Sequence, residues 1–120
     1  MDYNSDFRYD LKVGKIGEDR IAEMVEGDTI EVKSEINIWK ETRNVFIEFY
    51  SRGKVSGIAK TESKWWSTNF YYKDELKFTI TLLTDDLRKM VKVKGKYRIV
   101  NGGDNNTSKG FLVPIKDLIE

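Results

Sequence analysis

The chain has 120 residues, no cysteine and no histidine, and a formal net charge of +1 from 21 basic and 20 acidic residues. This length fits one domain, and a hydrophobic fraction of 39% supports a packed core rather than disorder. The missing residue types exclude disulfides, Ser-His and Cys-His nucleophile systems and nearly all zinc enzymes. Any metal would have to be held by carboxylates, carbonyls and water, a set that suits Mg²⁺ or Mn²⁺.

The beginning of the chain lacks the basic-then-apolar order of a signal peptide, and no apolar run reaches membrane length. We therefore expect a cytoplasmic protein, in the host cytoplasm if a phage encodes it. The nearly balanced charge neither predicts nor forbids a nucleic-acid partner, because the local distribution of charge matters more than its total.

The first half of the chain predicts a helix followed by two strands. Residues 14–27 carry apolar side chains at helical spacing, with Glu18 and Asp19 in the first turn, where the helix dipole favours acids. Residues 29–34 and 45–50 alternate apolar and polar side chains, which is typical of strands with one apolar face. Residues 39–44, between these strands, are expected to be a turn or a long hairpin connection.

The second half predicts short elements joined by polar loops. We expect a strand over residues 77–83, a short helix opened by Thr84, Asp85 and Asp86, and strands over residues 96–100 and 111–115, with Pro114 at a sheet edge or strand end. This order of elements predicts an α/β (α+β) domain.

The residues best suited to chemistry lie in the strand over residues 29–34. Glu31 and Lys33 share one face of it, because side chains alternate with period two. A carboxylate can anchor a divalent ion that activates water, and a neighbouring lysine can orient that water and stabilise charge on a phosphate. An acid and a lysine at this spacing are more often a solvated polar face.

Three further acids are candidates to complete a site with Glu31. Asp28 lies at the beginning of the strand, Glu18 in the preceding helix, and Glu48 on the polar side of the next predicted strand. Oxygen ligands of this kind suit Mg²⁺ or Mn²⁺.

The series of Gly17 and Glu18 in a helix, then Asp28 and Glu31-x-Lys33 on a strand, resembles the PD-(D/E)XK nuclease superfamily. This superfamily includes phage exonucleases, Holliday-junction resolvases and many restriction enzymes. The resemblance to its small phage-encoded members extends over most of residues 14–115. It includes residues 29–33, 44–48, 56–58 with Thr61 and Trp66, and 102–104 with Ser108 and Gly110.

The resemblance implies a single nuclease domain over residues 1–120, with a restriction-endonuclease-like core in which helices flank a mixed central sheet. It implies that Glu31 and an upstream acid bind Mg²⁺ or Mn²⁺ while Lys33 assists the attacking water, and that Glu18 is an additional helical ligand. The superfamily usually places the first acid on a separate strand, whereas Asp28 stands only three positions before Glu31. Either Asp28 or Glu48 therefore remains a candidate for that ligand.

The activity implied is that of a metal-dependent DNA endonuclease with a structural preference for branched DNA, as in a Holliday-junction resolvase. Cutting both strands would require a homodimer. The candidate contacts to nucleic acid are basic, hydroxyl and aromatic side chains in two segments: Arg52, Lys54, Ser56, Lys60, Lys64 and Trp65.

Two other functions remain open. The lysines and aromatic residues over 60–72 are the basis of the alternative, a non-catalytic module that binds single-stranded nucleic acid by stacking on its bases. For Trp66 and Phe70 we expect core packing instead, and of Trp65 and Trp66 we expect one buried and one partly exposed. A structural phage protein with no nucleic-acid role is the third possibility.

Overall fold

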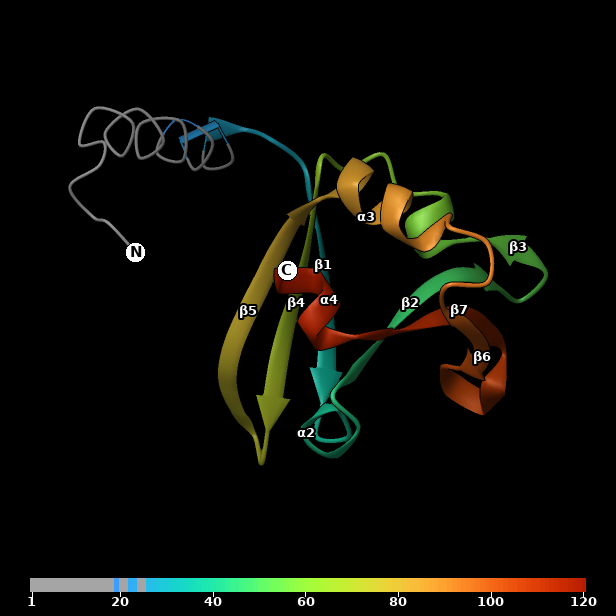
Figure 1. Ribbon diagram of the computed structural model, residues 1–120. Helices are drawn as coiled ribbons and strands as arrows, with labels where there is room; N and C mark the ends of the chain where they lie inside the picture. The colour runs from blue at the N-terminus through green and yellow to red at the C-terminus, as the bar shows by residue number, and fades with distance from the viewer. Residues whose placement is uncertain (1–18, 20–21, 24–25) are drawn as a thin grey trace, which may run out of the picture.

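The computed structural model describes residues 19, 22–23 and 26–120. Two β-sheets lie side by side, with short helices at their ends and between them (Figure 1). Of the helix predicted over residues 14–27, residues 19, 22, 23 and 26 are helical. The rest of that prediction, including Glu18, lies outside the described residues.

The first sheet contains three strands in the order β1-β4-β5: β1 (Ile30–Ile36), β4 (Trp65–Tyr72) and β5 (Glu75–Leu83). β1 runs parallel to β4, and β4 pairs with β5 in an antiparallel hairpin. The predicted strands over residues 29–34 and 77–83 are therefore confirmed.

The second sheet has the order β3-β2-β7-β6 and is antiparallel throughout. Its strands are β2 (Asn44–Ser51), β3 (Lys54–Val55), β6 (Arg98–Gly102) and β7 (Ser108–Pro114). The strands predicted over residues 45–50, 96–100 and 111–115 are confirmed within a few residues, and Pro114 ends β7.

The fold class is α+β, as predicted, but the expected single central sheet is divided into two. The chain changes sheet in the segment between β1 and β2. Asn37 and Arg43 both have left-handed backbone conformations, with φ of 63° and 58°, and they bracket the short helix α2 (Trp39–Thr42). The chain therefore turns away from the first sheet before β2 begins, and β2 pairs with β3 and β7 instead of β1.

α2 also corrects the expectation of a turn or hairpin connection at residues 39–44. Trp39 is buried, and its indole N–H donates a hydrogen bond to the Tyr71 carbonyl at 2.6 Å. Its ring meets that of Phe70 edge to face, with 5.4 Å between the centroids. These contacts of Trp39 with residues about thirty positions later hold the segment against the core, and turn residues in the local sequence do not indicate them.

The remaining helices are η1 (Gly57–Ala59), α3 (Thr84–Val91), η2 (Asp104–Asn106) and α4 (Ile115–Ile119). α3 begins with the predicted Thr84-Asp85-Asp86 and lies across the end of the first sheet at which β5 finishes (Figure 1). Across the described part of the chain, no helix combines the length and apolar character needed to span a membrane.

The core fills the space between the sheets and helices. Val45 and Ile47 of β2 are buried, as their alternation predicts, and they pack with residues from other strands and helices. Trp66 and Phe70 are core residues, which confirms the packing interpretation for both. Trp65 is buried as well, so the expectation that one of the two tryptophans is partly exposed is wrong.

Candidate functional site

The strand β1 has its polar face turned inward and its apolar face turned outward. Val32 and Ile36 on the outer face are 57% and 61% exposed, whereas Glu31, Lys33 and Glu35 are half-buried. β1 is an edge strand, so only one neighbouring strand, β4, flanks it. Burying three charged side chains in preference to apolar neighbours is unfavourable for stability, which makes this face a candidate for function.

Glu31 and Lys33 form an ion pair with 3.7 Å between the Glu31 Oε1 and the Lys33 Nζ. The Lys33 ammonium also lies 5.5 Å from the centre of the buried Trp66 ring, on the next strand of the same sheet. A pair that keeps this much contact with solvent contributes less than about 1 kcal/mol. The pair is therefore better understood as a positioned polar group than as a source of stability.

A second Glu-x-Lys pair in the chain gives a useful comparison. Glu75 and Lys77 on β5 lie 2.7 Å apart, but the Glu75 side chain is 72% exposed against 37% for Glu31. The neighbouring Lys77 ammonium lowers the pKa of Glu75. This second pair shares the sequence spacing of the first and has an equally exposed lysine, but its glutamate is more exposed, which makes it a matched control for the pair on β1.

Glu35 is the third charged residue on the inner face of β1. It was not among the acids predicted from the sequence to form a site. Its Oε1 accepts a hydrogen bond from the backbone N–H of Phe46 at 3.0 Å, which joins β1 to the beginning of β2. Burial raises the pKa of this carboxyl above its ordinary value, and the hydrogen bond opposes that shift. The same period of two that paired Glu31 with Lys33 would have identified Glu35.

Asp28 lies on the other side of the strand. Its Oδ2 accepts a hydrogen bond from the Trp65 indole N–H at 3.0 Å and lies 3.3 Å from the Lys64 ammonium. These partners lower the pKa of Asp28, the Trp65 hydrogen bond most. Trp65 pairs with Ile30, so it shares the outer face of the sheet, opposite Glu31. The structure therefore does not bring Asp28 and Glu31 together.

Glu31 instead lines a pocket of about 480 Å³, which we call the Glu31 pocket. Its other lining residues come from η1 and the loop that follows: Gly57, Lys60, Thr61 and Glu62. The pocket thus combines two carboxylates, a hydroxyl and a lysine. Glu62 and Thr61 were not among the site residues selected from the sequence, because a separation of about thirty residues hides their proximity to Glu31.

Glu48 is separated from this pocket by η1. Its carboxylate accepts a hydrogen bond from the Ser56 hydroxyl at 2.9 Å, and it lines a different pocket, of about 350 Å³, together with Arg52. A Cβ built on Gly57 would lie 2.1 Å from the Glu48 carbonyl oxygen. Gly57 therefore lies directly between the backbone of Glu48 and the Glu31 pocket.

The donor atoms of the Glu31 pocket are of the type that Mg²⁺ and Mn²⁺ prefer, although they are few. Within residues 19, 22–23 and 26–120, no group of three or more acidic side chains is arranged to hold a metal ion. Glu31 and Glu62 could supply two carboxylate ligands and leave the other positions to water, as Mg²⁺ sites often do.

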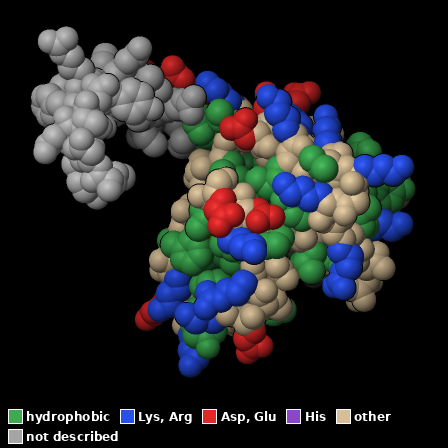
Figure 2. Space-filling model, viewed as in Figure 1, with side chains coloured by type: hydrophobic (Ala, Val, Ile, Leu, Met, Phe, Trp, Pro, Cys, Tyr) green, Lys and Arg blue, Asp and Glu red, His purple; other side chains and the backbone are tan. Residues whose placement is uncertain are grey.

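The candidate nucleic-acid contacts are divided among different environments. Arg52 and Lys54 are exposed at the hairpin between β2 and β3, and Lys60 is exposed at the Glu31 pocket. Lys64 pairs with Glu23 and Asp28, Ser56 with Glu48, and Trp65 is only 6% exposed. Figure 2 shows basic side chains spread over the part of the surface that carries α3, β3 and β6.

Comparison of the chain with protein-family models, with curated proteins and with solved structures finds no match. Function is therefore inferred from the residues themselves and from the geometry of the two sheets and their pockets.

Proposed function

We propose that the protein is a metal-dependent DNA endonuclease of the PD-(D/E)XK type, with its active site in the Glu31 pocket. The observation that carries the proposal is the position of Glu31 and Lys33. They share the half-buried face of an edge strand, 3.7 Å apart, and Glu31 lines a pocket with a second carboxylate. The exposed Glu75–Lys77 pair has the same spacing and lies outside that pocket.

The metal proposed is Mg²⁺ or Mn²⁺, held by Glu31 and Glu62 with the remaining positions filled by water. Such an ion lowers the pKa of a coordinated water and neutralises charge on a phosphate. Glu18, which the family resemblance suggests as a further ligand, lies outside the described residues. Asp28 is a weaker candidate than Glu62, because its carboxylate is bonded to Trp65 on the opposite face.

Lys33 has a separate role in this proposal. Its ammonium is held between the Glu31 carboxylate and the Trp66 ring, so it projects along the inner face of β1. From there it can hydrogen-bond the attacking water and stabilise the negative charge that develops on the phosphate. Removing a group that stabilises transition-state charge typically lowers the rate about 10²- to 10³-fold.

The substrate proposed is DNA, which the exposed Lys60 and the β2–β3 hairpin with Arg52 and Lys54 would contact through its phosphates. A branched substrate and a symmetric dimer are part of the same proposal, since one chain offers one active site and cutting two strands requires two.

The test is cleavage of labelled duplex, single-stranded and branched DNA with Mg²⁺, with Mn²⁺ and with EDTA. We expect metal-dependent cleavage by the wild type, a loss of about 100-fold or more in Lys33→Ala, and normal activity in Lys77→Ala. Binding without cleavage on every substrate would favour a non-catalytic nucleic-acid-binding module. Equal activity in Lys33→Ala and Lys77→Ala would contradict an active site on β1.

A further inference from the structure

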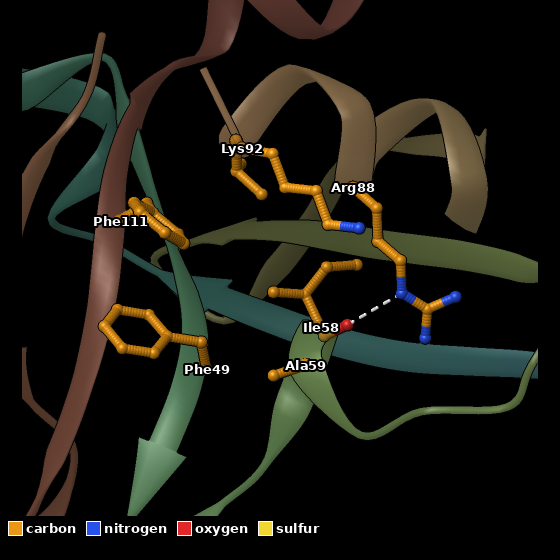
Figure 3. A pocket seen from close by; sticks show the side chains of 7 residues that line it. Phe49, Ile58, Ala59, Arg88, Lys92 and Phe111 are labelled. Carbon is orange, nitrogen blue, oxygen red and sulfur yellow. Dashed lines mark hydrogen bonds between the residues drawn. The ribbon is translucent and has the colours of Figure 1, made fainter. Parts of the chain in front are cut away.

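A third pocket, of about 310 Å³, lies between α3 and η1 on one side and the strands β2 and β7 on the other. We call it the α3 pocket. Its lining residues are predominantly apolar, with two basic side chains: Phe49, Ile58, Ala59, Val91, Phe111, Arg88 and Lys92. Figure 3 shows the two phenylalanine rings on one side, Ile58 and Ala59 facing them, and Arg88 and Lys92 extending from α3.

The aromatic wall of this pocket is preformed. The rings of Phe49 and Phe111 lie 4.7 Å apart between centroids, tilted by 35°, and both remain partly exposed. They come from neighbouring strands, β2 and β7, so the sheet holds them in place. Partly exposed aromatic rings on a rigid sheet provide a surface on which a flat apolar group can stack.

The two basic residues of the pocket differ in their contacts: Arg88 is hydrogen-bonded to the backbone, whereas Lys92 is exposed. The Arg88 Nε donates to the Ile58 carbonyl at 3.0 Å, and its Nη2 donates to the Thr61 carbonyl. Arg88 therefore fastens η1 and the following loop to α3. Lys92 is exposed and forms no ion pair with any residue that the structure describes. Its charge remains available to an anion beside the pocket.

The α3 pocket and the Glu31 pocket share a wall. Gly57, Lys60 and Thr61 line the Glu31 pocket, whereas Ile58 and Ala59, between them in the chain, line the α3 pocket. The two pockets are therefore neighbours along the chain, on either side of η1 and the residue that follows it.

We propose that the α3 pocket binds an unpaired base next to the cleaved phosphate, stacked on Phe49 and Phe111, with an adjoining phosphate at Lys92. This inference deepens the proposed nuclease function and rests on it for the identity of the ligand. The pocket volume lies at the lower end of the range of about 300–1,000 Å³ for small-molecule sites, so it suits one base and excludes a stacked pair. The substrate class would be DNA with an unpaired nucleotide at the cut.

The experiment measures binding in EDTA, so that cleavage does not interfere. A fluorescently labelled single-stranded oligonucleotide is compared with one of the same length and charge whose central nucleotides are abasic. We expect the wild type to bind the intact strand about tenfold more tightly, because one stacked base contributes about that factor. Equal binding of the two strands would overturn the proposal.

Two variants address the pocket itself. Phe111→Leu removes part of the aromatic wall, and Ala59→Gln fills the pocket from an exposed position without removing core atoms. Both should lose the preference for the intact strand, and Ala59→Gln serves if Phe111→Leu does not fold. If the folded variants keep the preference, the base binds elsewhere.

Lys92→Ala should weaken binding of both strands equally and lower the slope of log affinity against log salt concentration by about one. Lys89→Ala is the matched control, because Lys89 is exposed on α3 and does not line the pocket. An effect of the same size in both variants would mean general attraction by α3 rather than a site.

The two proposals fail separately. Base-dependent binding without cleavage in Mg²⁺ or Mn²⁺ would contradict the nuclease and keep the α3 pocket as a base-binding site. Metal-dependent cleavage with no preference for intact strands would keep the nuclease and contradict the pocket.

Discussion

The carboxylate of Asp28 accepts a hydrogen bond from the Trp65 indole N–H at 3.0 Å, on the face of the first sheet opposite Glu31. A second contact, 3.3 Å to the Lys64 ammonium, occupies the same oxygen. Asp28 thus joins the beginning of β1 to the beginning of β4. The nearest acid to Glu31 in the sequence therefore contacts Trp65 and Lys64 rather than the Glu31 pocket, in which the second carboxylate is Glu62.

Replacing Asp28 by asparagine should leave DNA cleavage nearly intact. The amide oxygen of the introduced side chain could still accept the Trp65 hydrogen bond, and only the attraction to Lys64 would be lost. We expect cleavage rates within about tenfold of the wild type, which corresponds to about 1.4 kcal/mol in the barrier. A loss of about 100-fold or more in a variant with an unchanged melting temperature would instead make Asp28 a metal ligand.

Glycine at position 57 is required by both its backbone and its surroundings. Its φ is +49°, and an added Cβ would lie 2.1 Å from the Glu48 carbonyl oxygen. Gly57→Ala should therefore destabilise the fold by about 3 kcal/mol or more. It should also displace η1, which separates the Glu31 pocket from the α3 pocket. Gly53→Ala is the control: its φ is +81° but its Cβ would meet nothing within 4 Å, so only about 1–2 kcal/mol of backbone strain is expected. Equal losses in chemical denaturation would contradict the close contact at Gly57.

Glu35 should make stability depend on pH. Burial raises its pKa in the folded state, so the folded protein keeps this proton at pH values where the unfolded chain has released it. Unfolding then releases a proton, and rising pH favours unfolding between the ordinary pKa of 4.5 and the raised folded value. Below that window the contribution of Glu35 is most favourable, and above it the burial penalty is complete.

The substitution Glu35→Gln tests this directly, since the amide oxygen of the introduced side chain can still accept the Phe46 N–H. The variant should gain stability relative to the wild type as the pH rises through that window, measured by urea denaturation at a series of pH values. Glu41→Gln, on the exposed surface of α2, is the control. Parallel pH profiles for the wild type and Glu35→Gln would show that Glu35 carries no burial penalty.

Local patterns predicted most of the strands, because alternation is a property of neighbouring residues, but they did not predict β4. β1, β2 and β5 lie close to their expected ranges, and Val45 and Ile47 face the core. The pattern could not decide which face of β1 is covered. Which face is covered depends on residues far away in the sequence, such as Trp66. Trp66 lies on the same side of the sheet as Lys33, and the apolar side chains of β1 face the solvent.

In the candidate site, too, local features were predicted from the sequence and long-range contacts were not. The shared face of Glu31 and Lys33 follows from their spacing and is confirmed by the geometry of β1. The Glu62 carboxylate, the wall made by η1 and the α3 pocket depend on contacts between segments far apart in the sequence. The pairing of β2 with β7 rather than β1, and the left-handed conformations of Asn37 and Arg43 between β1 and β2, were not predicted from the sequence.

The most direct test of the nuclease proposal is metal-dependent cleavage of DNA by Glu31→Gln beside Glu75→Gln. Both variants neutralise the acid of a Glu-x-Lys pair on an edge strand, and only Glu31 lines a pocket with a second carboxylate. The proposal predicts that Glu31→Gln loses about 100-fold or more of the activity in Mg²⁺ or Mn²⁺ while Glu75→Gln retains it. No cleavage by the wild type with either metal on any DNA, or full activity in Glu31→Gln, would contradict it.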